Sequence, residues 1–189
     1  MTLRILRATD HRRMPWKNGR GETVEIAIWP EGAGLDGFDW RISMAGVTED
    51  GDFSIFPGID RSLAVLTGDG VELQVQGSGL HRLTVDSPPL SFAADVPVSA
   101  RLLGQPITDL NVMTRRGLWR HELLRGDQPP RPDQADRVLI LATRALDLAG
   151  PGAPVRLGPL DVALCEGAAE RLIPDRIPGA WRIRLHRTA

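Results

Sequence analysis

Apolar and polar residues alternate with a period of two along most of this chain, and this pattern limits its fold more than any other feature. The segment WRIRLHR, residues 181–187, places apolar side chains at one set of alternate positions and basic side chains at the other. Successive side chains of a β-strand point to opposite faces, so the alternation predicts a strand. Similar patterns predict strands in the segments 24–29, 38–44, 81–86, 97–103, 136–143 and 155–167.

Glycine and proline turns separate these strands. Residues 62–75, SLAVLTGDGVELQV, predict two strands joined at the turn Gly68-Asp69-Gly70. The best helix candidate is the segment 114–126, TRRGLWRHELLRG, and Gly117 weakens it. Many short strands with glycine and proline turns predict an all-β fold, as an antiparallel sandwich or barrel.

A chain of 189 residues fits one domain or two small domains that are tightly fused. The most linker-like segment is DQPPRPDQADR, residues 127–137, and strand patterns resume after it. We therefore predict one compact unit over residues 1–189 with an internal division near 117–137. The first half, 1–117, holds the main motifs, and the second β half covers 137–189.

Composition and charge narrow the classes of partner. Charged residues make up 25% of the chain and apolar residues 42%, which is typical of a globular protein. The net charge of −1 gives no general attraction to nucleic acid, and Arg115 and Arg116 form the only tight basic cluster near the motifs. One cysteine rules out an internal disulfide, and neither a signal peptide nor a membrane span is indicated. We expect a soluble, cytoplasmic protein with no nucleic-acid or membrane partner.

Patterns typical of metal binding and covalent catalysis are missing from the sequence. The four histidines are far apart, with no HxH, HxxH or CxxC, whereas a β-barrel metal site usually takes two ligands from one strand. Cys165 lies in an apolar strand pattern, as a core residue does, and GxSxG is absent. The GxG at residues 19–21 precedes a strand, so it presents no helix N-terminus to a phosphate. We predict no metal and no cofactor, and the sequence indicates no catalytic residue.

Two residue types that are rare in this chain occur side by side in the segment MPWKNGRGE. Lys17 is the only lysine, and Asn18 and Asn111 are the only asparagines. The composition is typical of a GC-rich genome, in which arginine replaces lysine wherever either serves. A retained lysine indicates a site that needs a compact ammonium group. The alternative is chance together with an Asn-Gly turn.

Three polar stretches, at 16–19, 56–61 and 109–117, contain all the candidate site residues except Arg41. Alternation in the third stretch places four side chains on one face of a strand: Asp109, Asn111, Met113 and Arg115. Such a face is either exposed to solvent or lines the mouth of a barrel. The presence of the second asparagine in this stretch favours the barrel mouth.

Three sequence blocks resemble, in their order and their amino-acid sequences, the HutD/Ves family of cupin-like proteins. The blocks, which lie between residues 15 and 117, are PWKNGRGETVEIA, FDWRISMAGVTEDGDFSIFPGIDRSLAVLTGDGVEL and PITDLNVMTRRG. The weaker C-terminal pattern extends through LGPLDVALCEG. The combination is specific, whereas each block alone is weak. The chain departs from the family at Arg20, where a third glycine is usual, and this indicates a different loop or pocket rim.

The resemblance implies a bicupin, in which two small RmlC-like jelly-roll β-barrels form one unit without the usual cupin metal histidines. Family members are associated with histidine utilisation gene clusters or with environmental stress. The implied function is metal-free binding of a small anionic metabolite, such as urocanate or formylglutamate, in a regulatory or buffering role. Two alternatives stay open: a metal-independent hydrolase or isomerase with Lys17 as base, and a structural or interaction module without a polar cavity.

We expect a carboxylate site at one end of a barrel, built around cationic side chains. Arginine holds a carboxylate through two hydrogen bonds, as expected for Arg41 and Arg61, while Lys17 acts as a point charge. Asp60 and Asp109 would offset part of the positive charge, and a bound anion the rest.

Uncharged side chains complete the expected site, with donors and acceptors from the two asparagines and a flat apolar wall from Trp16. The predicted ligand-binding residues are Trp16, Lys17, Asn18, Arg41, Arg61, Asp109, Asn111 and Arg115. Plainer interpretations remain for two of them: Arg61 pairs with Asp60 or with a neighbouring loop, and Arg41 is an exposed strand residue. Phe53 and Phe56 are expected in the core rather than in the pocket.

Overall fold

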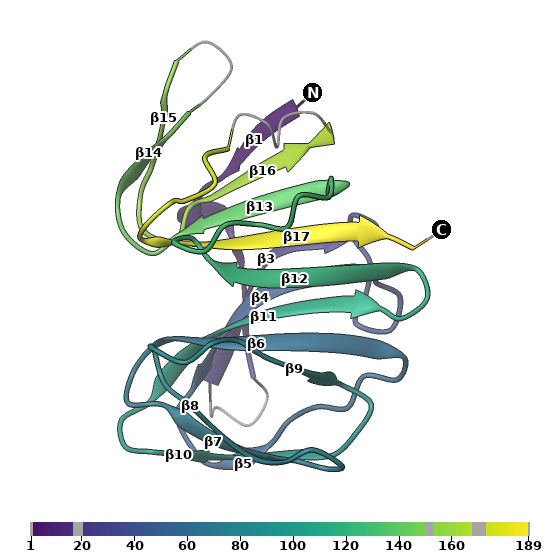
Figure 1. Ribbon diagram of the computed structural model, residues 1–189. Coiled ribbons are helices and arrows are strands. Elements are labelled where there is room, and N and C mark those ends of the chain that lie inside the picture. Colours follow the sequence, from purple (N-terminus) through teal and green to yellow (C-terminus); the bar gives the residue numbers. More distant parts are fainter. Residues whose placement is uncertain (1, 17–20, 150–152, 168–172, 189) are drawn as a thin grey trace. The chain divides into compact units, whose positions relative to one another are not determined.

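The described chain is almost entirely β-structure. The computed structural model describes residues 2–16, 21–149, 153–167 and 173–188 (Figure 1). Apart from strands, these residues contain one short 3-10 helix, η1 (Ala8–Asp10). No helix in this part of the chain is long and apolar enough to cross a membrane.

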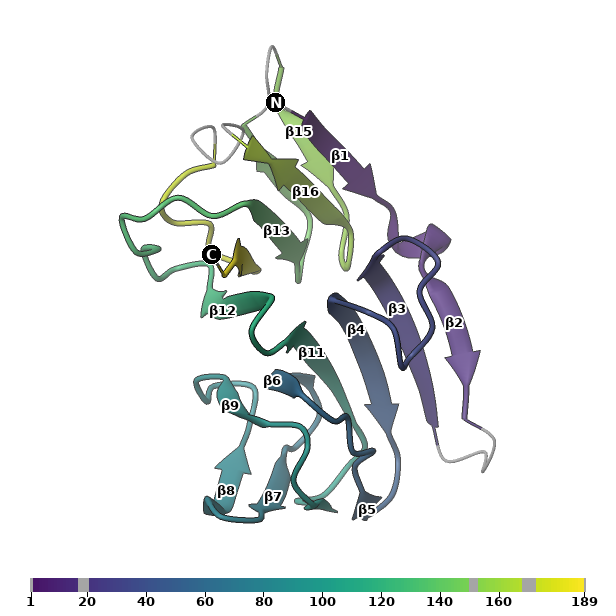
Figure 2. The same cartoon turned by 90° about the vertical axis from the view of Figure 1, so that its right-hand side faces the viewer.

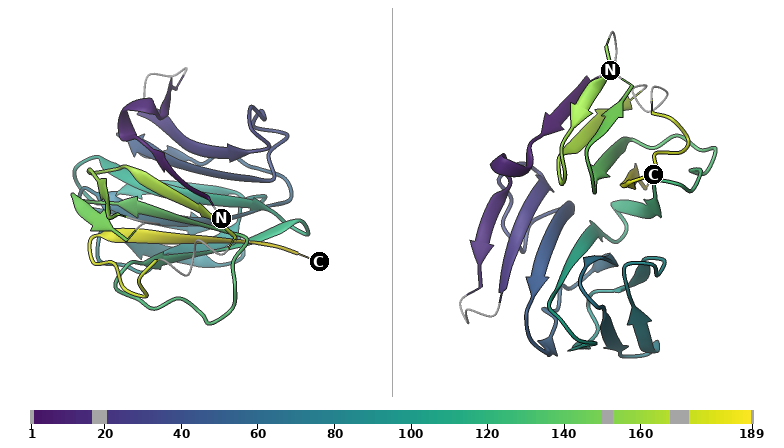
Figure 3. Two further views of the ribbon diagram at one scale, coloured as in Figure 1. Left: turned by 90° about the horizontal axis from the view of Figure 1, so that it is seen from above. Right: turned by 90° about the vertical axis from the view of Figure 1, so that its left-hand side faces the viewer.

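The chain divides into two compact units, a larger unit of residues 12–119 and a smaller unit of residues 1–11 and 120–189. The smaller unit is discontinuous in sequence because β1 (Thr2–Leu6) pairs antiparallel with β16 (Val162–Glu166). Figure 3 shows the purple first strand beside the yellow-green β16. Strand pairing therefore groups the first residues of the chain with the last.

Two antiparallel sheets form the larger unit. The six-stranded sheet has the spatial order β2 (Arg12–Pro15), β3 (Gly21–Trp29), β4 (Trp40–Val47), β11 (Ile107–Arg115), β6 (Ile59–Thr67), β9 (Leu90–Ala93). The four-stranded sheet has the order β5 (Gly51–Asp52), β10 (Val98–Leu102), β7 (Val71–Val75), β8 (Gly79–Leu83). Figure 2 shows β3, β4 and β11 side by side in the first sheet, with β7 and β8 in the second.

Apolar side chains from both sheets form one core in the larger unit. Leu63 and Val65 of β6 pack with Val71 and Leu73 of β7, and all four are at most 3% exposed. Ile107 of β11 belongs to the same cluster. The two sheets are therefore layers of one sandwich, which the alternating pattern of the sequence requires to bury its apolar faces.

A five-stranded antiparallel sheet dominates the smaller unit. Its spatial order is β1, β16, β13 (Arg137–Ala142), β17 (Ala180–Arg187), β12 (Trp119–Arg125). A separate hairpin pairs β14 (Leu146–Leu148) with β15 (Val155–Leu157). Its core includes Val138, Ile140 and Cys165, all at most 2% exposed, so the single cysteine is a core residue as predicted.

The strand predictions are confirmed, while the helix candidate is wrong. The two strands predicted around Gly68-Asp69-Gly70 are present, since β6 ends at Thr67 and β7 begins at Val71, with Gly68 and Gly70 at positive φ of 92° and 112°. They do not form a hairpin, because β6 belongs to the six-stranded sheet and β7 to the four-stranded one, so the turn connects the two layers of the sandwich. Residues 114–126, the helix candidate, instead contain the end of β11, a turn and β12. Gly117 adopts a φ of 84° in that turn, a conformation that interrupts a helix.

Strand β11 is buried on both faces, although its sequence alternates polar and apolar residues. Asp109 and Asn111 are 0% and 2% exposed, and Leu110 and Val112 on the opposite face are fully buried. The solvent-facing interpretation of this polar face is therefore excluded. A buried polar face requires partners or a cavity on its side of the sheet.

Candidate functional site

Cross-strand register gathers polar side chains on one face of the six-stranded sheet. Met113 of β11 lies opposite Arg41 of β4 on one side and Arg61 of β6 on the other. In the next row, Asn111 of β11 lies opposite Ser43 of β4. Residues directly opposite one another in antiparallel strands project to the same face. Side chains from three strands therefore meet at one place.

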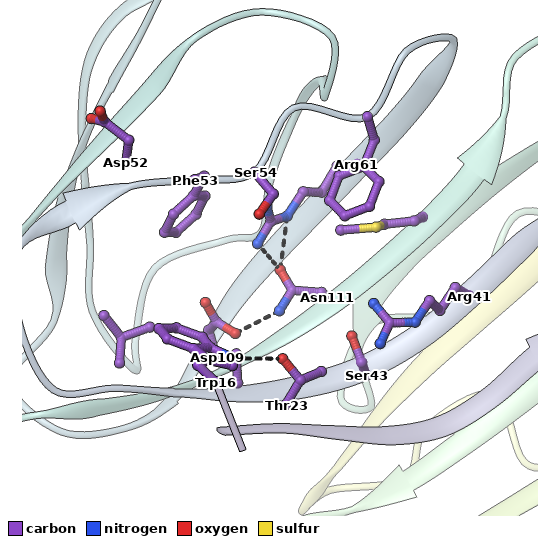
Figure 4. Close-up of a pocket in the computed structure, with 14 residues that line it drawn as sticks. Trp16, Thr23, Arg41, Ser43, Asp52, Phe53, Ser54, Arg61, Asp109 and Asn111 are labelled. Carbon is purple, nitrogen blue, oxygen red and sulfur yellow. Dashed lines mark hydrogen bonds between the residues drawn. The ribbon is translucent and has the colours of Figure 1, made fainter. Parts of the chain in front are cut away.

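This face lines a cavity of about 420 Å³ within the larger unit, which is a size suited to a small metabolite. Figure 4 shows the polar side chains of the sheet on one side of it, and Phe53 and Ser54 from the segment after β5 on the other. The lining residues are Trp16, Thr23, Arg41, Ser43, Ala45, Val47, Asp52, Phe53, Ser54, Phe56, Arg61, Asp109, Asn111 and Met113.

A chain of hydrogen bonds connects Arg61 to Asp109 along the cavity wall (Figure 4). Arg61 donates from both Nε and Nη2 to Oδ1 of Asn111, the first at 2.8 Å. Asn111 in turn donates from Nδ2 to Oδ1 of Asp109 at 2.6 Å. The neutral amide separates a buried cation from a buried carboxyl group and orients both.

Burial changes the titration of both charged ends of this chain. Desolvation lowers the pKa of Arg61 to about 10, an effect that Asp109 opposes and Arg41 reinforces. Burial raises the pKa of Asp109 to about 6, against the opposing effects of the Arg61 charge and the Asn111 hydrogen bond. The cavity therefore contains a carboxyl group that titrates near neutral pH, a feature that is enriched at functional sites.

Aromatic rings hold the Arg61 guanidinium group in place. Its Cζ lies 4.4 Å from the ring centroid of Phe53 and 5.7 Å from that of Phe92, which are cation–π contacts. Phe53 and Phe56 both line the cavity, so the prediction that they belong to the core rather than to the pocket is wrong. Phe53 serves both purposes, because it also packs against the apolar core of the larger unit.

Arg41 is fixed by an ion pair with Glu25 of β3. Its Nε donates to Oε2 of Glu25 at 2.7 Å, and the Arg41 side chain is only 5% exposed. The alternative of an exposed strand residue is therefore wrong for Arg41. Nη1 and Nη2 of Arg41 form no hydrogen bond with any residue that the structure describes, so they remain available to a ligand.

Trp16 forms one side of the cavity and is anchored at two points. Its indole Nε1 donates to Oγ1 of Thr23 at 2.9 Å, and its backbone N–H donates to the carbonyl oxygen of Gly21 at 2.9 Å. These bonds fix the ring plane, so Trp16 provides a flat wall in a defined orientation.

Five predicted site residues line this one cavity: Trp16, Arg41, Arg61, Asp109 and Asn111. Lys17 and Asn18 lie outside the described residues. Arg115 does not line the cavity, because its guanidinium group donates to backbone carbonyl oxygens: Nε and Nη2 contact that of Phe38 at 3.0 and 2.8 Å.

Asp60 does not offset the charge of the cavity. Its Oδ1 accepts hydrogen bonds from Nε and Nη2 of Arg116 at 3.0 and 2.8 Å, in an exposed ion pair. The interpretation that Arg61 pairs with Asp60 is therefore wrong, and Asp109 is the buried carboxyl group on this chain of hydrogen bonds.

The sequence pattern did not identify the residues that hold the predicted ones in place, which are Thr23, Glu25 and Phe92. A weak signal existed for Glu25, which lies on the polar side of the alternation in residues 24–29. Its partner Arg41 lies on the next strand, and a bulge shifts the β3–β4 register next to Glu25. Pairing across strands depends on such shifts, which the local sequence does not reveal.

One group of potential metal ligands occurs among the described residues, and it lies in the smaller unit. Ligand atoms of Glu122, Asp133 and His186 lie within 4.8 Å of one another. Nη1 of Arg184 already donates to both carboxylates, at 2.9 Å to Glu122 and 2.8 Å to Asp133. Burial and the charges of Arg120 and Arg184 lower the pKa of His186. A metal ion would therefore have to compete with a guanidinium group for the same oxygens.

Comparisons with known proteins agree on one family. The HutD family model matches residues 8–177. An uncharacterized 21.2 kDa protein from the hutC 3′ region of Pseudomonas putida is 40% identical over 173 residues, 90% of each chain. Protein Ves from Citrobacter koseri is 44% identical over 111 residues, 57% of this chain and 56% of that protein.

A solved structure supports the same assignment at the level of the fold. HutD from Pseudomonas fluorescens SBW25 superimposes with a TM-score of 0.79 at 32% sequence identity, and the match covers 100% of both chains. The all-β architecture is thus the cupin-like fold that the sequence resemblance implied. On the family model, the relatives and the fold together, this chain belongs to the HutD/Ves family.

Proposed function

We propose that this protein binds a small carboxylate metabolite in the cavity of the larger unit. The observation that carries the proposal is the state of the two buried arginines. Arg61 donates to a neutral amide rather than to a carboxylate, and Arg41 uses only Nε for its ion pair with Glu25. Both therefore direct unused guanidinium N–H groups to a ligand, and guanidinium groups bind carboxylates in two-point geometry.

The cavity also matches a small metabolite in size and surface. Its volume of about 420 Å³ lies in the range of small-molecule sites. Trp16 and Phe53 offer apolar contact area, while Ser43 and Thr23 offer hydroxyl groups. A purely structural module predicts no such polar cavity, so the cavity favours ligand binding over that alternative.

The family supplies the candidate ligands. One relative is named for its place beside hutC, and the similar solved structure is named HutD. Urocanate and N-formylglutamate, intermediates of histidine breakdown, each carry a carboxylate and a further polar group. The proposed role is to sense or buffer such an intermediate during histidine utilisation.

Calorimetric titration of N-formylglutamate and urocanate into the purified protein tests the proposal. We expect one site per chain, and we expect Arg61→Met to weaken binding by about tenfold or more, since a hydrogen bond to a charged group contributes about 1.5–3 kcal/mol. The matched control is Arg101→Met, which removes an exposed arginine of the same unit that pairs with Glu72. Failure of the wild type to bind either compound, or equal binding by Arg61→Met, would contradict the proposal.

A metal-independent enzyme is the second candidate function, and Asp109 favours it. Its buried carboxyl group, with a pKa raised to about 6, is suited to accept or donate a proton at neutral pH. This candidate predicts turnover of a pathway intermediate that Asp109→Asn abolishes. If the protein binds such compounds but turns over none of a panel of them, the enzyme candidate is excluded and only the binding function remains.

A further inference from the structure

Asp109 has one oxygen in use and one that is not. Oδ1 accepts a hydrogen bond from Asn111, while Oδ2 is buried and accepts no hydrogen bond of regular geometry from the described residues. The backbone N–H of Ala45, opposite Asp109 on β4, lies close enough to the carboxyl group to oppose the rise of its pKa. The side chain lines the cavity and is 0% exposed. A buried carboxylate oxygen without a donor is costly, whereas a protonated one can itself donate.

The charges around Asp109 leave little room for another anion. Arg41 faces the cavity from β4 and Arg61 from β6, while Asp52 faces it from the end of β5. Glu25 on β3 pairs with Arg41 and also lies 3.9 Å from Nη1 of the exposed Arg12. With Asp109 ionised, Glu25, Asp52 and Asp109 carry three negative charges against the two positive charges of Arg41 and Arg61, and Arg12 offsets part of that excess from the exposed side of Glu25. A bound carboxylate would add a fourth negative charge, and protonation of Asp109 would remove one.

In the protein without ligand, the pKa of Asp109 is already raised toward neutral pH. Burial raises its pKa to about 6 before any ligand enters. A carboxylate placed near Oδ2 acts in the same direction, because like charges disfavour the ionised form. A further upward shift of about two to three pKa units in the complex, within the range that burial and like charges produce, keeps the proton on Asp109 through pH 7.5.

We propose that the cavity binds a carboxylate together with one proton, which Asp109 takes up from solvent and holds on Oδ2 as a hydrogen-bond donor to the ligand. This inference rests on the proposed function, since it concerns the same site. The ligand group at Asp109 must then be an acceptor, such as a carboxylate or formyl oxygen. An N–H group would instead favour the ionised form of Asp109.

Titration of the wild-type protein with N-formylglutamate across pH 5.5–8 tests the inference. This compound has no group that titrates in that range, so proton uptake comes from the protein. We expect the Kd to rise about tenfold per pH unit above pH 6.5, as uptake of one proton requires. Repetition in Bis-Tris and Tris, which differ in ionisation enthalpy, should show close to one proton absorbed per ligand at pH 7.5.

Two isosteric variants locate the proton. Asp109→Asn keeps an acceptor for Asn111 and places an amide donor at the position of Oδ2, so we expect binding with no pH dependence and no proton uptake. Asp52→Asn removes the other cavity carboxylate that lacks an ion pair, and we expect it to keep the pH dependence. Loss of pH dependence in Asp52→Asn with retention in Asp109→Asn overturns the inference.

The outcomes separate this inference from the proposed function. A Kd that does not change with pH in the wild type overturns the inference and leaves carboxylate binding intact. An absence of binding at every pH overturns both. The wild-type series in two buffers decides the matter even if Asp109→Asn does not fold.

Discussion

Arg61 donates two hydrogen bonds to a single atom, Oδ1 of Asn111, and so a neutral side chain occupies the position where a buried arginine usually meets a carboxylate. The arrangement leaves the positive charge of Arg61 uncompensated at its nearest contact. Desolvation accordingly lowers the pKa of Arg61 to about 10. A charge held in this way interacts strongly with an anion that enters the cavity.

Asn111→Asp should remove that property with almost no change in shape. The new carboxylate would pair with Arg61 and would also lie beside Asp109, so the cavity would repel an anion. We expect the protein to stay folded and the affinity for N-formylglutamate at pH 7 to fall by about tenfold or more, in line with the 1.5–3 kcal/mol of a charged hydrogen bond. Calorimetry measures the affinity, and unchanged binding by the variant would contradict the interpretation of Asn111.

Asp109→Asn should stabilise the protein at neutral pH more than at acidic pH. The pKa of Asp109 is raised from 3.8 to about 6 on folding. The folded state therefore keeps the proton between pH 4 and 6 after the unfolded state has lost it, so wild-type stability falls as pH rises from about 4 to about 6 and is level above that. The full shift of about two pKa units corresponds to ~3 kcal/mol, of which about 2 kcal/mol is lost between pH 4.5 and 7.5. Urea unfolding at pH 4.5 and 7.5 measures the difference in unfolding free energy between the variant and the wild type. The same difference at both pH values would refute the prediction.

Asp161 anchors the first residues of the chain to the smaller unit, so Asp161→Ala should destabilise that unit. Its carboxylate accepts hydrogen bonds from Arg7 Nη1 at 2.7 Å, from the Ala8 N–H at 2.8 Å and from the Gly158 N–H at 2.9 Å. The variant removes the acceptor of the Ala8 and Gly158 N–H groups, at a cost of about 2–4 kcal/mol, while Arg7 keeps its bond to the Arg156 carbonyl oxygen.

Thermal unfolding measures this effect, and Asp147→Ala is the matched control. Asp147 belongs to the same unit but forms only an exposed ion pair with Arg156. Its removal should leave the unfolding temperature nearly unchanged, because exposed pairs contribute little. Equal effects of the two variants would contradict the anchoring role of Asp161.

Gly68→Ala should destabilise the turn between β6 and β7 more than Gly77→Ala destabilises the next turn. Both glycines have positive φ, 92° and 83°, so both variants meet similar backbone strain of about 1 kcal/mol. At Gly68 a Cβ would also lie 2.2 Å from the carbonyl oxygen of Pro106, whereas at Gly77 nothing lies within 4 Å. Chemical denaturation of both variants gives the loss of unfolding free energy for each, and the difference between the two losses is the cost of the clash with Pro106. Equal losses would contradict the predicted clash.

The fold was largely predictable from the sequence because alternation is a local property. The alternating segments correspond to strands, and the glycines at residues 68–70 mark a real turn. The turn passes from one sheet to the other instead of closing a hairpin, because β6 pairs with β9 and β11 while β7 pairs with β8 and β10. The segment 114–126 misled because its charged and leucine residues suit a helix, while pairing with β17 makes it a strand. The pairing of β1 with β16 is a contact between distant segments that no local pattern reveals.

The candidate site was predictable only in part, for a similar reason. Asp109 and Asn111 share a strand face, so the local pattern already placed them together. Arg61 was expected near them from its motif, but its bond to Asn111 rather than to Asp60 depends on the β6–β11 register. Glu25 was missed because its role appears only once β3 and β4 are paired. Local alternation identifies the face of a side chain, and register identifies its partner.

The pairing of β1 with β16 also has a consequence for the order in which the chain folds during synthesis. Residues 2–6 leave the ribosome about 160 residues before their partner strand, 162–166. The larger unit, residues 12–119, is contiguous and has all its strands before translation reaches β13. The cavity can thus form on the nascent chain, whereas β1 can pair with β16 only after residues 162–166 have been synthesised.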